Sequence, residues 1–140
     1  MKSFVCWISP HSKENWEICK SYNQWGIGKD SNVANSHAQK ISRGDLLFIW
    51  VGDIGYVGMA EVDIHRPLEV NEKNKAPWED GPYSFTIPWQ MIKELERPVY
   101  LKFDKQTRFQ EKTKIKQGVT NGGFFQIDEE QTKALLEIFE

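Results

Sequence analysis

The feature that most constrains the fold of this 140-residue chain is a pair of β-forming segments joined by a short turn. Residues 46–51 read L-L-F-I-W-V and residues 56–62 read Y-V-G-M-A-E-V, with G-D-I-G between them. This pattern predicts a β-hairpin. Gly58 and Ala60 are small residues on one face, which predicts close approach of another element. A hairpin of this length with a buried face is expected at the middle of a sheet.

Shorter segments surround the hairpin. We predict strands at residues 3–9, 83–87, 98–103 and 124–127, and helices at residues 13–24, 88–95 and 129–139. Ser12 and Asp128 are the expected N-caps of the first and last helices. Residues 26–35 and 65–81 are predicted loops. Strands and helices do not alternate regularly, which argues against a parallel doubly wound sheet. The order favours one α+β domain over residues 1–140, with a curved, mostly antiparallel sheet or pseudo-barrel flanked by helices.

Charge and cysteine usage exclude several functional classes. The 18 basic and 20 acidic residues give a net charge of −2, so any nucleic-acid contact must come from a local patch. Cys6 and Cys19 form no C-x-x-C pair, which predicts reduced thiols in a cytoplasmic protein and no metal site. The longest apolar run, Leu46–Val51, is too short to span a membrane, and there is no signal peptide.

Catalytic motifs are missing from the sequence. There is no nucleophile elbow, phosphate-binding loop or zinc-protease helix, and no arrangement of serine, histidine and aspartate indicates a triad. The three histidines, His11, His37 and His65, have no metal-ligand spacing. Glu61 is a candidate lone general base, although a carboxylate at a sheet edge is the commoner role. We therefore expect neither an enzyme nor a bound cofactor.

Tryptophans supply the strongest functional signal. Three of the six are assigned to the core because they fall in or near predicted elements: Trp7, Trp50 and Trp89. Trp25 and Trp78 fall in predicted loops, where two converging rings make a slot for a flat or cationic ligand. A tryptophan that plugs the core end of a helix is the alternative for Trp25. Asn15 and Asn23 are candidates to read the polar edge of a base, because an amide both donates and accepts; exposed helical asparagines are the alternative.

These segments together resemble the EVE domain family of prokaryotes. The resemblance lies in the N-terminal run F-V-C-W-I-S-P-H-S-K-E-N-W-E-I-C-K-S-Y-N-Q-W-G-I-G and in three later runs, R-G-D-L-L-F-I-W-V, G-Y-V-G-M-A-E-V and P-W-E-D-G-P-Y-S-F-T-I. The EVE family shares the PUA-like fold with YTH domains, which read N6-methyladenine in RNA. The resemblance implies a non-enzymatic reader that holds a flipped modified base, such as N6-methyladenine or 5-methylcytosine, in an aromatic cage.

The resemblance also implies roles for individual residues. By position, Trp25 and Trp78 are cage walls, with Leu68 or Pro77 as a third. Asn15 reads the base edge, His11 makes another polar contact, and the Gly26 carbonyl receives the exocyclic amine. Secondary candidates around the pocket are Ser9, Lys29 and Ser36.

Phosphate binding departs from the YTH pattern. Where YTH domains carry a basic residue, residues 120–123 of this chain read T-N-G-G. Lys29, Arg108, Lys112 and Lys114 are the expected substitutes. The sequence does not choose between DNA and RNA. We expect a monomer whose downstream partner is a nuclease or methyltransferase. Two alternatives stay open: a sensor of a modified nucleoside or methylated amine (or targeting module of a larger complex), and a hydrolase using His11 or Glu61.

Overall fold

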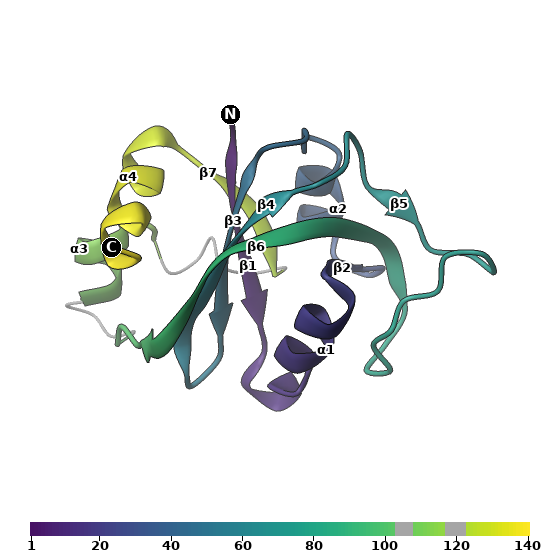
Figure 1. The fold of residues 1–140 in the computed structure, drawn as a ribbon, viewed down its shortest axis with the longest axis horizontal. Helices are drawn as coiled ribbons and strands as arrows, with labels where there is room; N and C mark the ends of the chain where they lie inside the picture. The colour runs from purple at the N-terminus through teal and green to yellow at the C-terminus, as the bar shows by residue number, and fades with distance from the viewer. Residues whose placement is uncertain (103–107, 117–122) are drawn as a thin grey trace.

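The computed structural model describes residues 1–102, 108–116 and 123–140. Figure 1 shows a strongly curved sheet with helices at both ends. In chain order the elements are β1 (Ser3–Ile8), η1 (Pro10–Ser12), α1 (Asn15–Tyr22), β2 (Gln24–Gly28), α2 (Asn32–Ala38), β3 (Leu46–Val51), β4 (Gly55–Val62), β5 (Leu68–Glu69), β6 (Tyr83–Val99), α3 (Arg108–Thr113), β7 (Phe124–Ile127) and α4 (Glu129–Ile138).

The strand order is β2-β6-β4-β3-β1-β7, with β5 added beside β6. The predicted hairpin, β3–β4, lies at the middle of this order, as expected. β1 and β3 run parallel, with Ser3 opposite Leu46, whereas the other pairs are antiparallel. The sheet curls into a half-barrel (Figure 1). The predicted α+β fold class, a curved and mostly antiparallel sheet flanked by helices, is therefore confirmed.

The helix predicted at residues 88–95 is wrong, because those residues continue β6. The first part of β6 pairs with β2, and the part from Trp89 to Val99 pairs with β4. Pro88 lies opposite Gln24. The neighbouring pair is hydrogen-bonded, with Trp89 N donating to Asn23 O at 3.0 Å. Pro88 and Gln24 therefore form a non-hydrogen-bonded pair, in which the β2–β6 ladder does not require an N–H donor from Pro88. Of the strand predicted at 98–103, residues 98–99 end β6, residues 100–102 are irregular and residue 103 lies outside the described residues.

The loop predicted at residues 26–35 is also wrong, because it contains the end of β2 and the start of α2. Trp25 is consequently a strand residue rather than a loop residue. The first helix is shorter than predicted and ends where Asn23 adopts φ 51°. Ser12 does not cap this helix. By contrast, Asp128 caps α4 as predicted, in a capping box with Gln131.

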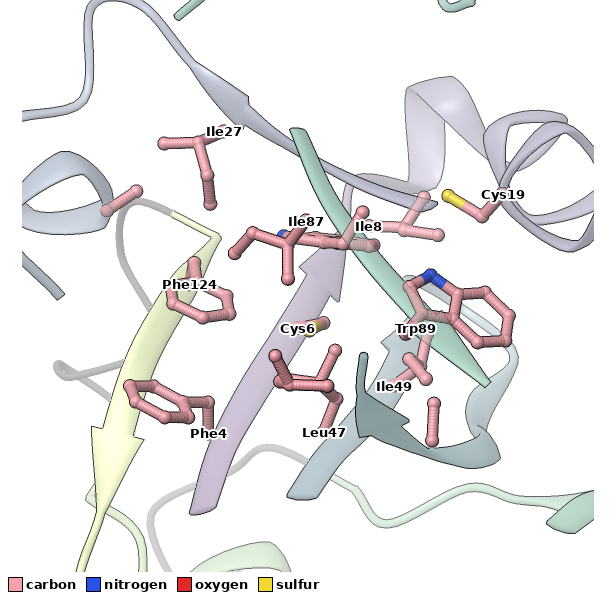
Figure 2. Close-up of a cluster of buried hydrophobic side chains, with 14 of the residues drawn as sticks. Phe4, Cys6, Ile8, Cys19, Ile27, Leu47, Ile49, Ile87, Trp89 and Phe124 are labelled. Carbon is pink, nitrogen blue, oxygen red and sulfur yellow. The ribbon is translucent and has the colours of Figure 1, made fainter. Parts of the chain in front are cut away.

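The core consists of two clusters of buried side chains. One contains Phe4, Cys6 and Ile8 from β1, and the other contains Val5, because successive side chains of a strand point to opposite faces. Figure 2 shows the first cluster between β1, β3, β6 and α1. The Trp16 ring of α1 lies 3.0 Å from where a Cβ on Gly58 would be, so the close approach predicted at Gly58 is confirmed.

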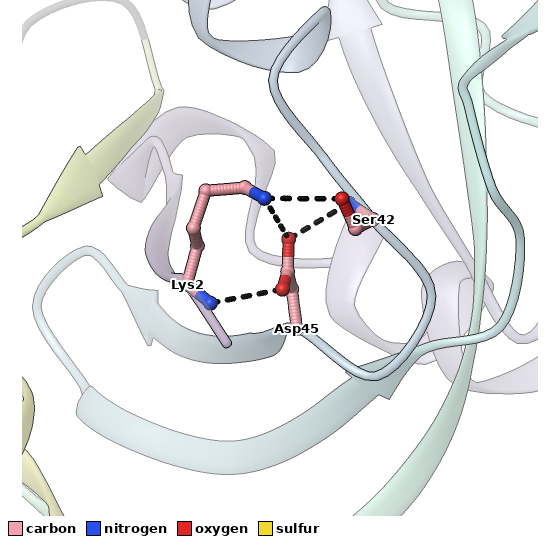
Figure 3. Close-up of polar contacts among 3 residues, drawn as sticks. All are labelled: Lys2, Ser42 and Asp45. Atoms are coloured by element: carbon pink, nitrogen blue, oxygen red, sulfur yellow. Dashed lines mark hydrogen bonds and ion pairs between the residues drawn. The ribbon is translucent and has the colours of Figure 1, made fainter.

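A buried carboxylate ties the start of β1 to the start of β3 (Figure 3). Asp45, 2% exposed, accepts hydrogen bonds from the backbone N of Lys2 at 2.9 Å and of Ser42 at 2.7 Å. Lys2 Nζ lies 3.5 Å from the same carboxylate. Three donors therefore hold Asp45 in place at the parallel pair. Within the described residues, no helix has the length and apolar character needed to cross a membrane.

Candidate functional site

The candidate site is a pocket of about 190 Å³ beside the edge strand β2. Its wall is formed by the end of β1, by η1, by the first turns of α1, by β2, by the segment after β5 and by the start of β6. The volume is below the roughly 300–1,000 Å³ that drug-sized ligands occupy. The pocket therefore suits a group no larger than a single base.

One of the residues that line the pocket, Gly26, lies on the unpaired edge of β2. In an antiparallel pair, hydrogen-bonded and non-hydrogen-bonded residue pairs alternate along the ladder. Asn23 bonds to Trp89, so Gly26, three residues on, belongs to a non-hydrogen-bonded pair with Thr86. Its N–H and C=O thus point away from β6. No further hydrogen bond to either group is found among the described residues.

The outer face of Gly26 is covered by aromatic rings. A Cβ placed on Gly26 would lie 2.6 Å from Cζ3 of Trp78 and 2.9 Å from Cδ1 of Tyr83. The Trp78 and Tyr83 rings contact each other, with centroids 5.0 Å apart and planes inclined at 45°. Only a residue without a side chain permits this packing. Position 26 is therefore glycine because Trp78 lies directly on its backbone.

Trp25 leaves β2 on the opposite face from Trp78, because side chains alternate along a strand. The two indoles therefore flank the exposed edge of Gly26, and both line the pocket. Both are more than nine-tenths buried, with Trp25 6% and Trp78 5% exposed. The expectation of two loop tryptophans that converge on a slot is thus corrected, because Trp25 lies in a strand and the Trp78 ring rests on Tyr83. The Trp25 Nε1 atom is buried without a hydrogen-bond partner.

Polar groups line the side of the pocket nearest α1. Asn15, 8% exposed, donates from Nδ2 to Oδ2 of Asp80 at 3.0 Å. The Tyr83 hydroxyl donates to Oδ1 of the same carboxylate. Burial raises the pKa of Tyr83 above its usual value, and the hydrogen bond to Asp80 adds to the shift. Tyr83 therefore stays protonated and remains a donor to Asp80.

Cys19 lines the pocket as a thiol rather than a thiolate. Burial raises the pKa of Cys19 to about 12, and a hydrogen bond from the Trp78 side chain offsets part of this rise. Cys6, fully buried in β1, has its pKa raised for the same main reason. A thiol with a raised pKa is a poor nucleophile and metal ligand. Among the described residues, no three His, Cys, Asp or Glu side chains form a metal-binding group.

The structure brings together some of the predicted site residues and separates others. Five of them line the pocket: Ser9, Asn15, Trp25, Gly26 and Trp78. Four lie outside its wall: His11, Leu68, Pro77 and Ser36. Asn23 ends α1 in a left-handed conformation instead of facing the pocket. Sequence reasoning did not predict Ser12, Asp80 or Tyr83 as site residues, although the P-W-E-D-G-P-Y run contains the last two.

The predicted phosphate-binding cations are divided between two regions. Lys29 follows the lining residue Gly28, and its backbone N donates to Pro82 O at 3.0 Å, which places it beside the pocket. Arg108, Lys112 and Lys114 lie in or just after α3, which packs against α4 at the other end of the molecule from α1 and β2 (Figure 1). The side chain of Arg108 lies outside the described residues.

Comparisons with known proteins agree with this fold. The profile of the EVE domain family matches residues 5–138. A comparison with curated protein sequences finds no significant match. Among solved structures, the chain is similar to the Mmi1 YTH domain, with a TM-score of 0.65 and 15% identity over 99% of this chain and 74% of that one. It is also similar to a Pseudomonas putida protein, with a TM-score of 0.65 and 12% identity over 99% of this chain and 99% of that one. A hypothetical protein from Leishmania major is similar too, with a TM-score of 0.68 and 13% identity over 99% of this chain and 94% of that one. Another similar structure is a complex of the Mmi1 YTH domain with RNA.

Proposed function

This chain belongs to the EVE domain family, and we propose that it is a non-enzymatic reader that binds a flipped, modified base of DNA or RNA in the pocket at Gly26. The observation that carries the proposal is the unpaired backbone edge of Gly26 between two indoles. A flat ring lying in the plane of β2 meets Trp25 on one side and Trp78 on the other. Its edge then meets the free N–H and C=O of Gly26.

The energetics favour such a ligand. Stacking on an aromatic side chain contributes about 1–3 kcal/mol per base, and two rings act on the same base here. Flipping a base out of a duplex costs a few kcal/mol, and less from a single strand. One added methyl group in an apolar pocket is favoured by about 1–3 kcal/mol. The net result is modest affinity that depends on the modification.

Base entry requires a movement of Trp78. Its ring rests on Gly26 and Tyr83, so the space between the two indoles opens only when Trp78 moves outward. Trp78 lies in the segment between β5 and β6, outside regular secondary structure, which permits this movement. We therefore expect the fluorescence of Trp78 to change on binding.

Phosphate contacts in this proposal begin at Lys29, next to the pocket. Lys112 and Lys114, together with Arg108, would contact phosphates only of a nucleic-acid strand long enough to reach α3 at the far end of the molecule. The Mmi1 YTH domain has been solved in complex with RNA, which supports a nucleic-acid ligand for this fold. Either DNA or RNA can be the polymer that carries the modified base. A nuclease or methyltransferase is the proposed downstream partner.

The decisive experiment is a binding panel of short DNA and RNA strands carrying N6-methyladenine, 5-methylcytosine or no modification. We expect fluorescence polarisation to detect tighter binding of one modified strand, and Trp78→Ala to abolish the preference. Tyr22→Ala is the matched aromatic control, because Tyr22 is 60% exposed on α1 and does not line the pocket. Equal affinity for modified and plain strands would refute the proposal.

A small-molecule sensor is the second candidate, favoured by the presence of one carboxylate, Asp80, in an aromatic pocket of this size. A carboxylate beside aromatic rings suits a methylated amine or a free modified nucleoside. This candidate predicts a rise in melting temperature with the free ligand and no binding of oligonucleotides at low salt. Oligonucleotide binding that Trp78→Ala abolishes excludes it.

A further inference from the structure

We infer that Asp80 makes this pocket selective for a base that carries an exocyclic amine. The inference rests on the proposed function and narrows its ligand to a modified cytosine or adenine, against thymine and uracil. It comes from the hydrogen-bonding capacity that the pocket leaves unused.

The Asp80 carboxylate is oriented by two donors and retains free acceptor sites. Asn15 Nδ2 donates to Oδ2 at 3.0 Å, and the Tyr83 hydroxyl donates to Oδ1. An ionised carboxylate offers about four acceptor positions, so about half remain available. Asp80 lines the pocket yet is itself exposed at its rim. A ligand in the pocket can therefore donate to Asp80 without displacing either protein donor.

The neighbouring polar groups reinforce the same preference. Asn15 uses one of its two amide N–H groups on Asp80, and its Oδ1 is an acceptor that a ligand can meet. The C=O of Gly26 at the unpaired edge is another acceptor, next to the N–H of the same residue. The Asp80 carboxylate, Asn15 Oδ1 and the Gly26 C=O are thus three acceptors that a donating ligand edge can meet.

Bases differ in this respect. Cytosine presents an amine at ring position 4 and adenine presents one at ring position 6, whereas thymine and uracil present a carbonyl oxygen at position 4. A carbonyl oxygen placed against a carboxylate makes no hydrogen bond, and its partial negative charge is repelled by the carboxylate. An amine placed there makes a charge-assisted hydrogen bond. The discrimination therefore has both an attractive and a repulsive part.

Local charge also favours an amine. Asp80 is the one charged side chain among the described residues that line the pocket. No ion pair among those residues neutralises it. The pocket is therefore negative, which keeps phosphates outside it, beside Lys29, and admits a neutral base by its donor edge.

The test uses two matched pairs of bases in otherwise identical single strands. One pair is 5-methylcytosine and thymine, which share the 5-methyl group and differ in the amine. The other is N6-methyladenine and N6,N6-dimethyladenine, of which the second lacks the last N–H donor. We expect the amine-donating member of at least one pair to bind about tenfold tighter to the wild-type chain.

Two variants of equal charge change assign this preference to Asp80. Asp80→Asn keeps the shape of the side chain and should reduce the preference to about twofold or less. Glu79→Gln removes the adjacent exposed carboxylate, which lies outside the pocket wall, and should leave the preference unchanged. Tyr83→Phe removes one donor that orients Asp80 and should give an intermediate value. This variant also serves as the test if Asp80→Asn lowers the melting temperature.

The outcomes separate the inference from the proposed function. Equal binding within both pairs, or a full preference retained in Asp80→Asn, overturns the inference while base binding stands. Strands that bind no better than unmodified controls overturn the proposed function, and the inference falls with it.

Discussion

Replacing Gly26 by alanine should expel the Trp78 ring from its place on β2. The added Cβ would lie 2.6 Å from Cζ3 and 2.9 Å from Cε3 of Trp78, whereas carbon atoms pack best at about 3.5–4.0 Å. Both atoms belong to a rigid indole, so the ring must move as a whole by about 1 Å. Overpacking of this kind costs about 1–3 kcal/mol.

Gly28→Ala provides a matched control on the same strand. Gly28 also lines the pocket, but a Cβ there has no heavy atom within 4 Å, and neither glycine has a positive φ. Removing glycine from the unfolded chain stabilises by about 0.4–1 kcal/mol in both variants, so this effect cancels between them. The difference between the variants therefore isolates the clash with Trp78.

Thermal and chemical unfolding measure this difference. At about 2–4 °C per kcal/mol, Gly26→Ala should melt roughly 2–12 °C below Gly28→Ala. Under the proposed function, Gly26→Ala should also lose modification-dependent binding, because it displaces both the backbone edge and the Trp78 wall of the pocket. Two variants equal in stability to within about 0.5 kcal/mol would refute the packing of Trp78 on Gly26.

Two further predictions concern the scaffold. Asp45→Ala should cost about 1–3 kcal/mol, measured by urea unfolding, because it leaves the part-buried backbone N–H groups of Lys2 and Ser42 without their acceptor; an unchanged midpoint would contradict this. His37 should make the fold weaken at low pH, because its Nδ1 accepts from Gln126 N at 2.9 Å and burial lowers its pKa from the usual value of about 6.5. The unfolded chain then binds more protons, so stability is lost as pH falls through and below 6.5; His37→Gln should flatten this dependence.

Elements with a complete local signal were predictable from the sequence. The β3–β4 hairpin combines two β-forming runs with a glycine turn, and α4 combines the Asp128 capping box with an apolar face. Both signals lie within one short, continuous stretch of the chain. The structure reproduces both elements to within one or two residues at their ends.

Elements defined by distant partners were not predictable. β2 contains two glycines in five residues, and it is a strand because it pairs with β6 some sixty positions later. Pro88 indicated a helix start, yet its position opposite Gln24 needs no N–H donor, so β6 continues through it. α2 buries only Ala34 and Ala38, which leaves a faint amphipathic pattern.

The residues of the candidate site also divide into those with a local sequence signal and those defined by distant partners. The family resemblance implied pocket roles for Asn15, Trp25, Gly26 and Trp78, and the structure brings these residues together. It could not identify Asp80, because an exposed aspartate gains significance only through its hydrogen bond to Asn15, 65 positions earlier in the chain. Nor could it place the cations of α3, because the curvature of the sheet decides which end of the molecule α3 occupies.

The pocket exists because the barrel does not close at Gly26. The sheet ends in β2 on one side and β7 on the other, and α2 packs against both. Asn35 of α2 donates to Gly28 O at 2.9 Å, and His37 of α2 accepts from Gln126 N of β7. The helix thus satisfies the polar edges that a closed barrel would pair. The hydrogen bonds from α2 to β2 begin at Gly28, so the backbone edge at Gly26 stays free. Under the proposed function, a base with its own donors and acceptors would pair with this edge.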